Sequence, residues 1–235
     1  MQNDELKKQV GQAAVREVEA GMHIGIGTGS TAEAFIVALA ELVASGLDIT
    51  GVPTSNRTEN LCRDLGIPLA SLSEAGPLDL TIDGADEVSA DLQLIKGGGG
   101  AHLREKIVAS ASSRMIVIAD QSKIVDQLGA FPLPVELVTF DADYTARMVQ
   151  AMLGEILERE VEAHMRRNEQ GEPFVTDAGN TIYDYHCGVI PDPGLLALAL
   201  DTVPGVVEHG LFVDIAELAL IATDNGVQRI YKAQG

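Results

Sequence analysis

Aromatic side chains are scarce in this sequence and tryptophan is absent: Phe, Tyr and Trp together make up 4% of the 235 residues. Hydrophobic residues nevertheless account for 46% of the chain. That fraction is enough to bury a sizeable core, which excludes an intrinsically disordered protein. The length allows either one large domain or a main domain with a smaller one.

Basic residues are also few. The 16 lysines and arginines face 35 aspartates and glutamates, so the formal net charge at pH 7 is −19. A chain this acidic repels nucleic acid and anionic membranes unless it has a strong basic patch. The densest basic pairs, Lys7-Lys8 and Arg166-Arg167, form no such patch. The sequence therefore predicts neither a nucleic-acid partner nor a membrane partner.

Cysteines and long apolar runs are scarce too. Cys62 and Cys187 lie far apart in the chain, so we expect two buried, reduced thiols rather than a disulfide framework or a zinc site. The most apolar stretch, 34–44, is short and contains Glu41, and the N-terminal residues lack the apolar core of a signal peptide. These features predict a cytoplasmic protein.

Helical and extended patterns alternate in the first half of the chain. The periodicity predicts helices over 4–20, 32–44, 56–65 and 101–112, and strands over 22–26, 49–53, 78–82, 92–95 and 114–119. Strands that alternate with helices are typical of a parallel sheet with helices on its faces.

The pattern changes from residue 131, where Pro132 and Pro134 interrupt the chain. The predicted elements are then a strand over 135–140, a helix over 144–165, a hairpin that turns at 177–180, a helix over 195–203 and a strand over 206–212. This βαββαβ order predicts a small α+β domain over 131–212. Two apolar runs, 218–222 and 227–231, return the chain to a first domain made of 1–130 and 213–235.

Four loops that follow predicted strands contain the candidate functional residues, because ligands bind at the carboxyl ends of strands in open α/β sheets. The first loop spans 25–31, and its glycines, hydroxyls and helix N-terminal amides suit a phosphate. A tight turn with a Ser/Thr helix cap and a dinucleotide-binding loop stay open as alternatives. The dinucleotide spacing is met only in its looser form, counted from Gly27, and no acidic residue follows the next strand.

The second loop, Asp83-Gly84-Ala85-Asp86-Glu87, is acidic. Three carboxylates within five residues are candidates for a divalent-metal site, although the spacing of a calcium loop is missing. Two of these carboxylates could instead hold sugar hydroxyls and transfer protons. A solvated acidic turn is the third interpretation.

The third loop contains four consecutive glycines after Lys96, and it joins an apolar strand to an apolar-faced helix. That context is poor for a flexible linker, which is the alternative interpretation. Lys96 is one of only six lysines, so we interpret it as a partner for an anion or an oxyanion. Glu105, in the second turn of the following helix, either points back toward this loop or is an ordinary exposed glutamate.

The fourth loop, Asp120-Gln121-Ser122-Lys123, follows the apolar strand 114–119. Lys123 either adds a second positive charge at the same sheet edge or belongs to an ordinary charged turn. Each of the four loops follows a predicted strand, so their coincidence at one sheet edge matters more than any single motif.

Together these motifs resemble those of the type A ribose-5-phosphate isomerases. The matching segments are GIGTGSTA (25–32), TIDGADEV (81–88), KGGGGAHLREKIVA (96–109), DQSKIVDQLGAFPLPVE (120–136), VTDAGNTIYD (175–184) and VPGVVEHGLF (203–212). Two departures are local. Gly100 stands where a small residue such as Ala is expected, which could loosen the start of the next helix, and Tyr185-His186-Cys187 varies from the pattern.

The resemblance implies interconversion of ribose 5-phosphate and ribulose 5-phosphate without a metal or an organic cofactor. It implies an α/β fold in which a Rossmann-like parallel-sheet domain carries an inserted ferredoxin-like α+β domain, assembled as a homodimer or a larger homo-oligomer. It also makes Glu105 the catalytic base. Carried over by motif, the substrate-binding residues are Thr28, Gly29, Ser30, Thr31, Asp83, Gly84, Ala85, Asp86, Lys96, Gly97, Gly98, Gly99 and Lys123.

The chemistry of an aldose–ketose isomerisation suggests further roles for these side chains. We hypothesise that Lys96 stabilises an enediolate, that Asp83 and Asp86 hold sugar hydroxyls with Asp83 assisting ring opening, and that Ser30, Thr31 and Lys123 hold the phosphate. Two other classes share part of the pattern. A sugar-phosphate sensor of a repressor would need a helix-turn-helix and a basic surface, and a dehydrogenase or coenzyme A transferase would share only the sheet.

Overall fold

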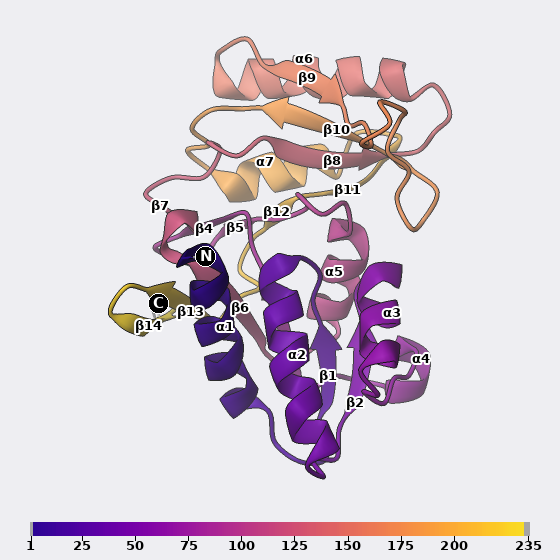
Figure 1. Cartoon of the computed structure of the whole chain (residues 1–235). Helices are drawn as coiled ribbons and strands as arrows, with labels where there is room; N and C mark the ends of the chain where they lie inside the picture. Colours follow the sequence, from indigo (N-terminus) through magenta and orange to yellow (C-terminus); the bar gives the residue numbers. More distant parts are fainter. Residues whose placement is uncertain (1, 233–235) are drawn as a thin grey trace.

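The largest sheet of the computed structural model has six strands in the order β14-β13-β6-β3-β1-β2 (Figure 1). The structure describes residues 2–232, so the ends of the predicted first domain, residue 1 and residues 233–235, lie outside the described residues. Five strands are parallel, and β14 runs antiparallel to β13. The bounds are β1 His23–Ile26, β2 Thr50–Pro53, β3 Leu80–Gly84, β6 Met115–Asp120, β13 Leu218–Thr223 and β14 Gly226–Tyr231.

Helices cover both faces of this sheet because its strands are apolar on both sides. Successive side chains of β6 point to opposite faces: Ile116 and Ile118 pack in one core with α1 and α2, and Met115 and Val117 pack in another that includes Ala109 of α5. This arrangement confirms the predicted parallel sheet with flanking helices. One predicted strand is misplaced: residues 92–95 contribute only Leu94–Ile95, which lies in a separate small sheet and pairs antiparallel with its neighbours. The helices are α1 Gln2–Ala14, α2 Ser30–Ala44, α3 Asn56–Asp64, α4 Leu72–Ala75 and α5 His102–Ser110, and the 3₁₀ turn η1 is Val15–Glu17.

A second sheet, in the order β11-β8-β10-β9, lies above the first in the view of Figure 1. Its neighbouring strands are all antiparallel. Helices α6 and α7 pack against it and share a separate hydrophobic core with it. The bounds are β8 Leu133–Leu137, α6 Ala142–Leu157, β9 Glu162–Met165, β10 Thr181–His186, α7 Pro193–Leu200 and β11 Val206–His209.

A third, small sheet combines strands from before and after the second one, in the order β12-β5-β4-β7. The carboxylate of Glu87, in this sheet, accepts hydrogen bonds from the amides of Gly129 (2.6 Å) and Phe131 (2.5 Å). Glu87 therefore fixes the point at which the chain leaves for β8. The bounds are β4 Glu87–Ser89, β5 Leu94–Ile95, the 3₁₀ turn η2 Gln121–Lys123, β7 Ile124–Val125 and β12 Leu211–Phe212.

The predicted helix over 144–165 is wrong in its second half. Helix α6 ends at Leu157, where Glu158 takes a left-handed conformation with φ +52°, and the following residues form strand β9. Met165 and Ala163 pair with Tyr183 and Tyr185 of β10. The segment has good helix formers, but the hydrogen bonds that it makes with β10 override that local preference.

The predicted strand over 206–212 is also wrong, because it breaks at Gly210 into β11 and β12, which belong to different sheets. The Gly210 amide donates to Pro134 O, and its carbonyl accepts from Lys96 N, both at 2.8 Å. A Cβ atom at this position would lie 2.3 Å from Lys96 O. Only glycine allows the chain to come this close to Lys96. The two hydrogen bonds of Gly210 join strand β8 of the second sheet to the start of the glycine-rich loop.

Three smaller expectations can also be compared with the structure. The first helix is shorter than predicted, because α1 ends at Ala14 and Val18 is already extended. Cys62 and Cys187 are free and buried, as predicted. Within residues 2–232, no helix is both long and apolar enough to cross a membrane.

Candidate active site

A pocket of about 120 Å³ lies where the loops after β1, β3, β5 and β6 meet. Each of the twelve residues that line it belongs to the set predicted from the sequence. Asp83 and Gly98 are the two members of that set that do not line it, but each contacts a residue that does: Asp83 contacts Lys96, and Gly98 contacts Asp86. The lining residues are Thr28, Gly29, Ser30, Thr31, Gly84, Ala85, Asp86, Lys96, Gly97, Gly99, Glu105 and Lys123.

Three buried ionisable side chains lie together here: Lys96 and Glu105 line the pocket, and Asp83 lies behind them. Lys96 Nζ lies 3.1 Å from Asp83 Oδ2 and 3.3 Å from Glu105 Oε2, and it donates a hydrogen bond to Gly84 O. The three side chains are at most 5% exposed. Glu105 lies on helix α5 and points back toward the loop that contains Lys96. This agrees with the first of the two interpretations offered for it and not with an exposed glutamate.

One ammonium group, that of Lys96, lies beside two carboxyl groups, so it cannot balance the charge of both. Burial and the neighbouring Asp83 raise the pKa of Glu105 to about 8, although Lys96 opposes this shift. Burial also raises the pKa of Asp83, again against the effect of Lys96. For Lys96, burial alone would lower the pKa, but the carboxylates of Asp83 and Glu105 outweigh burial and raise it. Glu105 is thus a carboxyl group that exchanges a proton near neutral pH.

Backbone amides fix the two aspartates of the acidic loop. Asp83 Oδ1 accepts from Thr28 N (3.1 Å) and Gly84 N (2.7 Å), and Asp86 Oδ2 accepts from Gly98 N (2.7 Å). A Cβ atom at Gly27 would lie 2.2 Å from Asp83 Oδ1, so the first loop needs glycine there for this contact. Asp83 therefore couples the first two loops, and Asp86 couples the second and third.

The first loop opens helix α2 without a side-chain cap. Its N-cap residue is Gly29, with φ +112° and ψ 169°, and no side chain hydrogen-bonds to the first-turn amides. The Ser/Thr-cap alternative is therefore wrong. The hydroxyl-bearing residues Ser30 and Thr31 line the pocket, and Lys123 at the end of η2 lines it too. A helix N-terminus, two hydroxyls and an ammonium group suit a phosphate.

A group of hydroxyls beneath the first loop was not predicted from the sequence. Thr28 Oγ1 lies 2.7 Å from Thr54 Oγ1, 2.8 Å from Ser55 Oγ and 3.0 Å from Thr58 Oγ1. Thr58 Oγ1 also donates to Gly27 O at 2.9 Å. The Thr28 hydroxyl is thus committed to this group rather than to the pocket. The signal was present, since Thr54 and Ser55 directly follow β2 at the same sheet edge.

The aromatic ring beneath Lys96 was not predicted from the sequence either. Phe212 is fully buried, and its ring centroid lies 5.4 Å from Lys96 Nζ and 5.1 Å from Lys106 Nζ. An ammonium within about 6 Å of an aromatic face is stabilised by the ring quadrupole. Phe212 therefore favours the charged form of Lys96 in a place that water hardly reaches.

The acidic loop is poorly arranged for a metal ion. Asp83 faces Lys96, Asp86 accepts from Gly98, and Glu87 points to the amides at 129 and 131. A divalent cation at Asp83 would compete with the ammonium of Lys96 for the same oxygens. The arrangement favours the sugar-hydroxyl interpretation.

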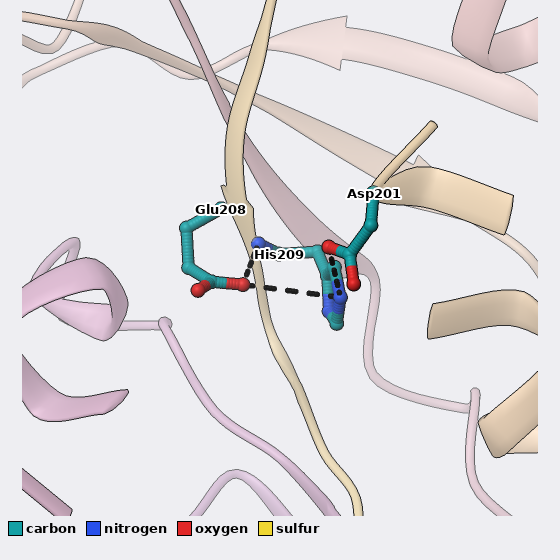
Figure 2. Close-up of side chains that lie close together, drawn as sticks. All are labelled: Asp201, Glu208 and His209. Carbon is teal, nitrogen blue, oxygen red and sulfur yellow. Dashed lines mark hydrogen bonds and ion pairs between the residues drawn. The ribbon is translucent and has the colours of Figure 1, made fainter. Parts of the chain in front are cut away.

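Within residues 2–232, one other cluster brings potential metal ligands together: atoms of Asp201, Glu208 and His209 all lie within 4.8 Å of one another (Figure 2). The Lys106 ammonium already lies 2.5 Å from Glu208 Oε1 and donates to His209 O at 2.9 Å. Leu211 N donates to His209 Nδ1, which leaves the ring proton on Nε2, facing Asp201. We interpret the cluster as an internal ion-pair network in which Lys106 supplies the cation.

The pocket thus combines a buried carboxyl group with a raised pKa, a buried ammonium, fixed aspartates and a polar end that contains two hydroxyl groups and a second ammonium. That set can move a proton between neighbouring carbons of a phosphorylated sugar while an adjacent oxygen carries negative charge. Besides Glu105, the carboxyl group among the residues that line the pocket is that of Asp86, which already accepts a hydrogen bond from Gly98 N.

Known proteins match this chain over almost its whole length. The family model of ribose 5-phosphate isomerase A (phosphoriboisomerase A) matches residues 50–226. The ribose-5-phosphate isomerase A of Parvibaculum lavamentivorans is 53% identical, covering 98% of this chain and 99% of that protein. The solved structure of the Neisseria gonorrhoeae isomerase superimposes with a TM-score of 0.89 at 41% identity, covering 99% and 98% of the two chains.

A second solved structure, a D-ribose-5-phosphate isomerase in complex with phospho-erythronic acid, superimposes with a TM-score of 0.92 at 36% identity. It covers 98% of this chain and 100% of that one. The chain belongs to the ribose 5-phosphate isomerase A family.

Proposed function

We propose that Glu105 is the base that moves a proton between C2 and C1 when this isomerase interconverts ribose 5-phosphate and ribulose 5-phosphate. The observation that carries this assignment is its position, buried in the pocket floor with Oε2 3.3 Å from Lys96 Nζ. A general base works best when its pKa lies near the operating pH, and the pKa of Glu105 is raised to about 8. A positioned base contributes about 10²- to 10⁴-fold to the rate.

Lys96 stabilises the enediolate that forms when the proton leaves C2. Its ammonium lies beside Glu105, so an oxygen on the reacting carbons would be in reach of Lys96 while the base is in reach of C2 and C1. Amides of the glycine loop assist Lys96. Preorganised donors of this kind act where water is excluded, and each contributes about 2.7–4 kcal/mol to the stabilisation of a transition state.

The aspartates and the polar end of the pocket hold the rest of the sugar. Asp83 and Asp86 accept sugar hydroxyls, and Asp83, next to Lys96, assists the opening of the furanose ring. Ser30 and Thr31 at the start of α2 bind the phosphate together with Lys123. The open N-terminus of a 15-residue helix supports this assignment, because its amides and dipole favour an anion.

The finer description of the fold is also a proposal. We propose that residues 131–212 form a ferredoxin-like domain inserted into a Rossmann-like domain of 1–130 and 213–235. The βαββαβ order of β8-α6-β9-β10-α7-β11 and the antiparallel strand order β11-β8-β10-β9 support it. A homodimeric assembly and a cytoplasmic location remain predictions from the sequence.

The decisive experiment measures ribulose 5-phosphate formation by the wild type and by Glu105→Gln, with and without a chelator. Chelator-resistant activity that disappears in Glu105→Gln supports both the reaction without a metal and the assigned base. Glu59→Gln on α3 is the matched control, because the Glu59 carboxylate pairs with Arg63 and does not line this pocket. Full activity in Glu105→Gln would refute the assignment of Glu105 as the base. Loss of wild-type activity with the chelator would instead indicate that Asp83 and Asp86 bind a metal ion.

The repressor-sensor class makes a different prediction for the same assay. A sensor would bind the sugar phosphate without turning it over, and it would have no need for a buried carboxyl group beside Lys96. The dehydrogenase class predicts binding of a nicotinamide cofactor. Titration of the wild type with NAD measures that directly.

A further inference from the structure

One arginine of the second sheet holds the glycine-rich loop of the pocket. Arg166, directly after β9, donates from Nη1 to Gly97 O at 2.6 Å and to Gly98 O at 3.3 Å. The other edge of its guanidinium is paired with Asp184 of β10, with Nε 2.9 Å from Oδ2 and Nη2 bonded to Oδ1. This bidentate pair fixes the plane of the guanidinium, and the Arg166 side chain is only 13% exposed.

The backbone of Arg166 is fixed as well. Its amide donates to Ile182 O at 2.8 Å, and its carbonyl accepts from Phe174 N at 2.9 Å. The guanidinium is therefore anchored through both its main chain and Asp184. The loop that it holds has no side chains of its own to pack, and Gly97 has φ +107°, so outside contacts must determine its conformation.

Holding these two carbonyls determines where the neighbouring amides point. In a trans peptide the C=O of one residue and the N–H of the next point in opposite directions. With Gly97 O held by Arg166, the Gly98 amide points the other way and donates to Asp86 Oδ2 at 2.7 Å. The same logic directs the Gly99 amide away from Arg166, and Gly99 lines the pocket.

Arg166 itself does not line the pocket, and its charge is already matched by Asp184. We propose that Arg166 is a positioning residue for the isomerisation. It acts through the carbonyls of Gly97 and Gly98 to aim the Gly99 amide at the enediolate oxygen and to keep Asp86 in place. This inference rests on the proposed function of the pocket.

The test compares Arg166→Gln with Arg167→Gln in the full chain. Arg167 is the neighbouring residue, is exposed, and donates to Gly171 O outside the pocket. We expect Arg166→Gln to lower kcat about 10- to 100-fold with a KM within a few-fold of the wild type, since a small misplacement of reacting groups costs up to about 10²-fold. Arg167→Gln should leave both constants unchanged.

Three further readouts separate positioning from mere stabilisation of the fold. Added guanidinium should restore part of the activity of Arg166→Ala, and Asp184→Asn should show a smaller loss of kcat than Arg166→Gln. Phospho-erythronic acid, whose carboxylate stands in for the enediolate oxygens, should bind more weakly to Arg166→Gln than to the wild type. Amide hydrogen exchange of residues 97–100 should be faster in the variant without any ligand.

The exchange measurement does not depend on the reaction, so it distinguishes a failure of this inference from a failure of the proposed function. Unchanged exchange at 97–100 in Arg166→Gln overturns the inference even if activity falls. A wild-type kcat in that variant also overturns it. So does a loss of kcat that follows a global fall in thermal stability and that guanidinium does not restore in Arg166→Ala.

Discussion

Lys96 Nζ lies 3.3 Å from Glu105 Oε2, with the two side chains 2% and 5% exposed. A simple buried ion pair would hold the carboxylate as a permanent anion. Here the ammonium also serves Asp83 at 3.1 Å, so two carboxyl groups share one cation. Burial, together with the charge of Asp83, therefore raises the pKa of Glu105 to about 8 against the effect of Lys96, and there the group can accept a proton and return it.

Replacing Lys96 by Met should damage both stability and catalysis. The substitution leaves Asp83 and Glu105 buried without a cation, and removing one partner of a buried pair costs about 3–5 kcal/mol. Loss of an oxyanion donor lowers kcat by about 10²- to 10³-fold. Urea unfolding and initial rates measure the two effects, with the surface variant Lys232→Met as control. The double variant Lys96→Met/Asp83→Asn should recover stability without recovering kcat; recovery of both would contradict the assigned role.

Glu105→Gln should change how stability depends on pH. The pKa of Glu105 in the folded protein is about 8, above its ordinary value of 4.5, so between these values the folded state holds a proton that the unfolded state has released. Stability from this group is therefore present at low pH and is lost as the pH rises from about 4.5 to 8.

Glu105→Gln removes this loss, so its free energy of unfolding should exceed that of the wild type most clearly at pH 8 and above. Urea unfolding at a series of pH values checks it, since the difference between the two proteins should grow with pH over this window. A constant difference would show that the pKa of Glu105 is not raised.

Gly100→Ala should destabilise the protein, which corrects the idea that this extra glycine loosens the helix of Glu105. Gly100 has φ +75°, and a Cβ atom there would lie 2.5 Å from the ring of Phe174. Left-handed strain for a residue other than glycine costs about 1–3 kcal/mol. The control Gly171→Ala has φ +79° but no atom within 4 Å. Thermal unfolding should show a larger loss at position 100, and equal losses would exclude a role for the Phe174 contact.

Lys123→Ala should lower kcat/KM for the phosphorylated sugar but not for the unphosphorylated one. A hydrogen bond to a charged group contributes about 1.5–3 kcal/mol, so kcat/KM for ribose 5-phosphate should fall about 10- to 100-fold. The kcat/KM for unphosphorylated ribose should stay within a few-fold of the wild type. Lys8→Ala, at an exposed position on α1, is the control. Equal losses of kcat/KM for both sugars would refute the assignment of Lys123 to the phosphate group.

The glycine-rich, acidic and lysine-bearing loops could be located from the sequence because their signals are local. Each directly follows a short apolar run, and the parallel strands β1, β3 and β6 place their carboxyl ends at one edge of the sheet. Knowing the preceding strand was therefore enough to predict that Ser30, Asp86 and Lys123 lie at one edge. Lys96 follows β5, which lies in the third sheet and pairs antiparallel with its neighbours, so the parallel-sheet argument does not account for its place in the pocket. The continuous apolar run of β6 likewise indicated a strand buried on both faces.

Tertiary structure alone decided what local patterns left ambiguous. Glu162–Met165 has helix-forming residues but is a strand, because β10 supplies its hydrogen-bond partners. Glu105 would be an ordinary helical glutamate in isolation; burial against Asp83 and Lys96 sets its pKa. Arg166 reaches the glycine loop across 69 residues of sequence. Pairing, burial and charge compensation depend on groups distant in the chain, so no local pattern contains them.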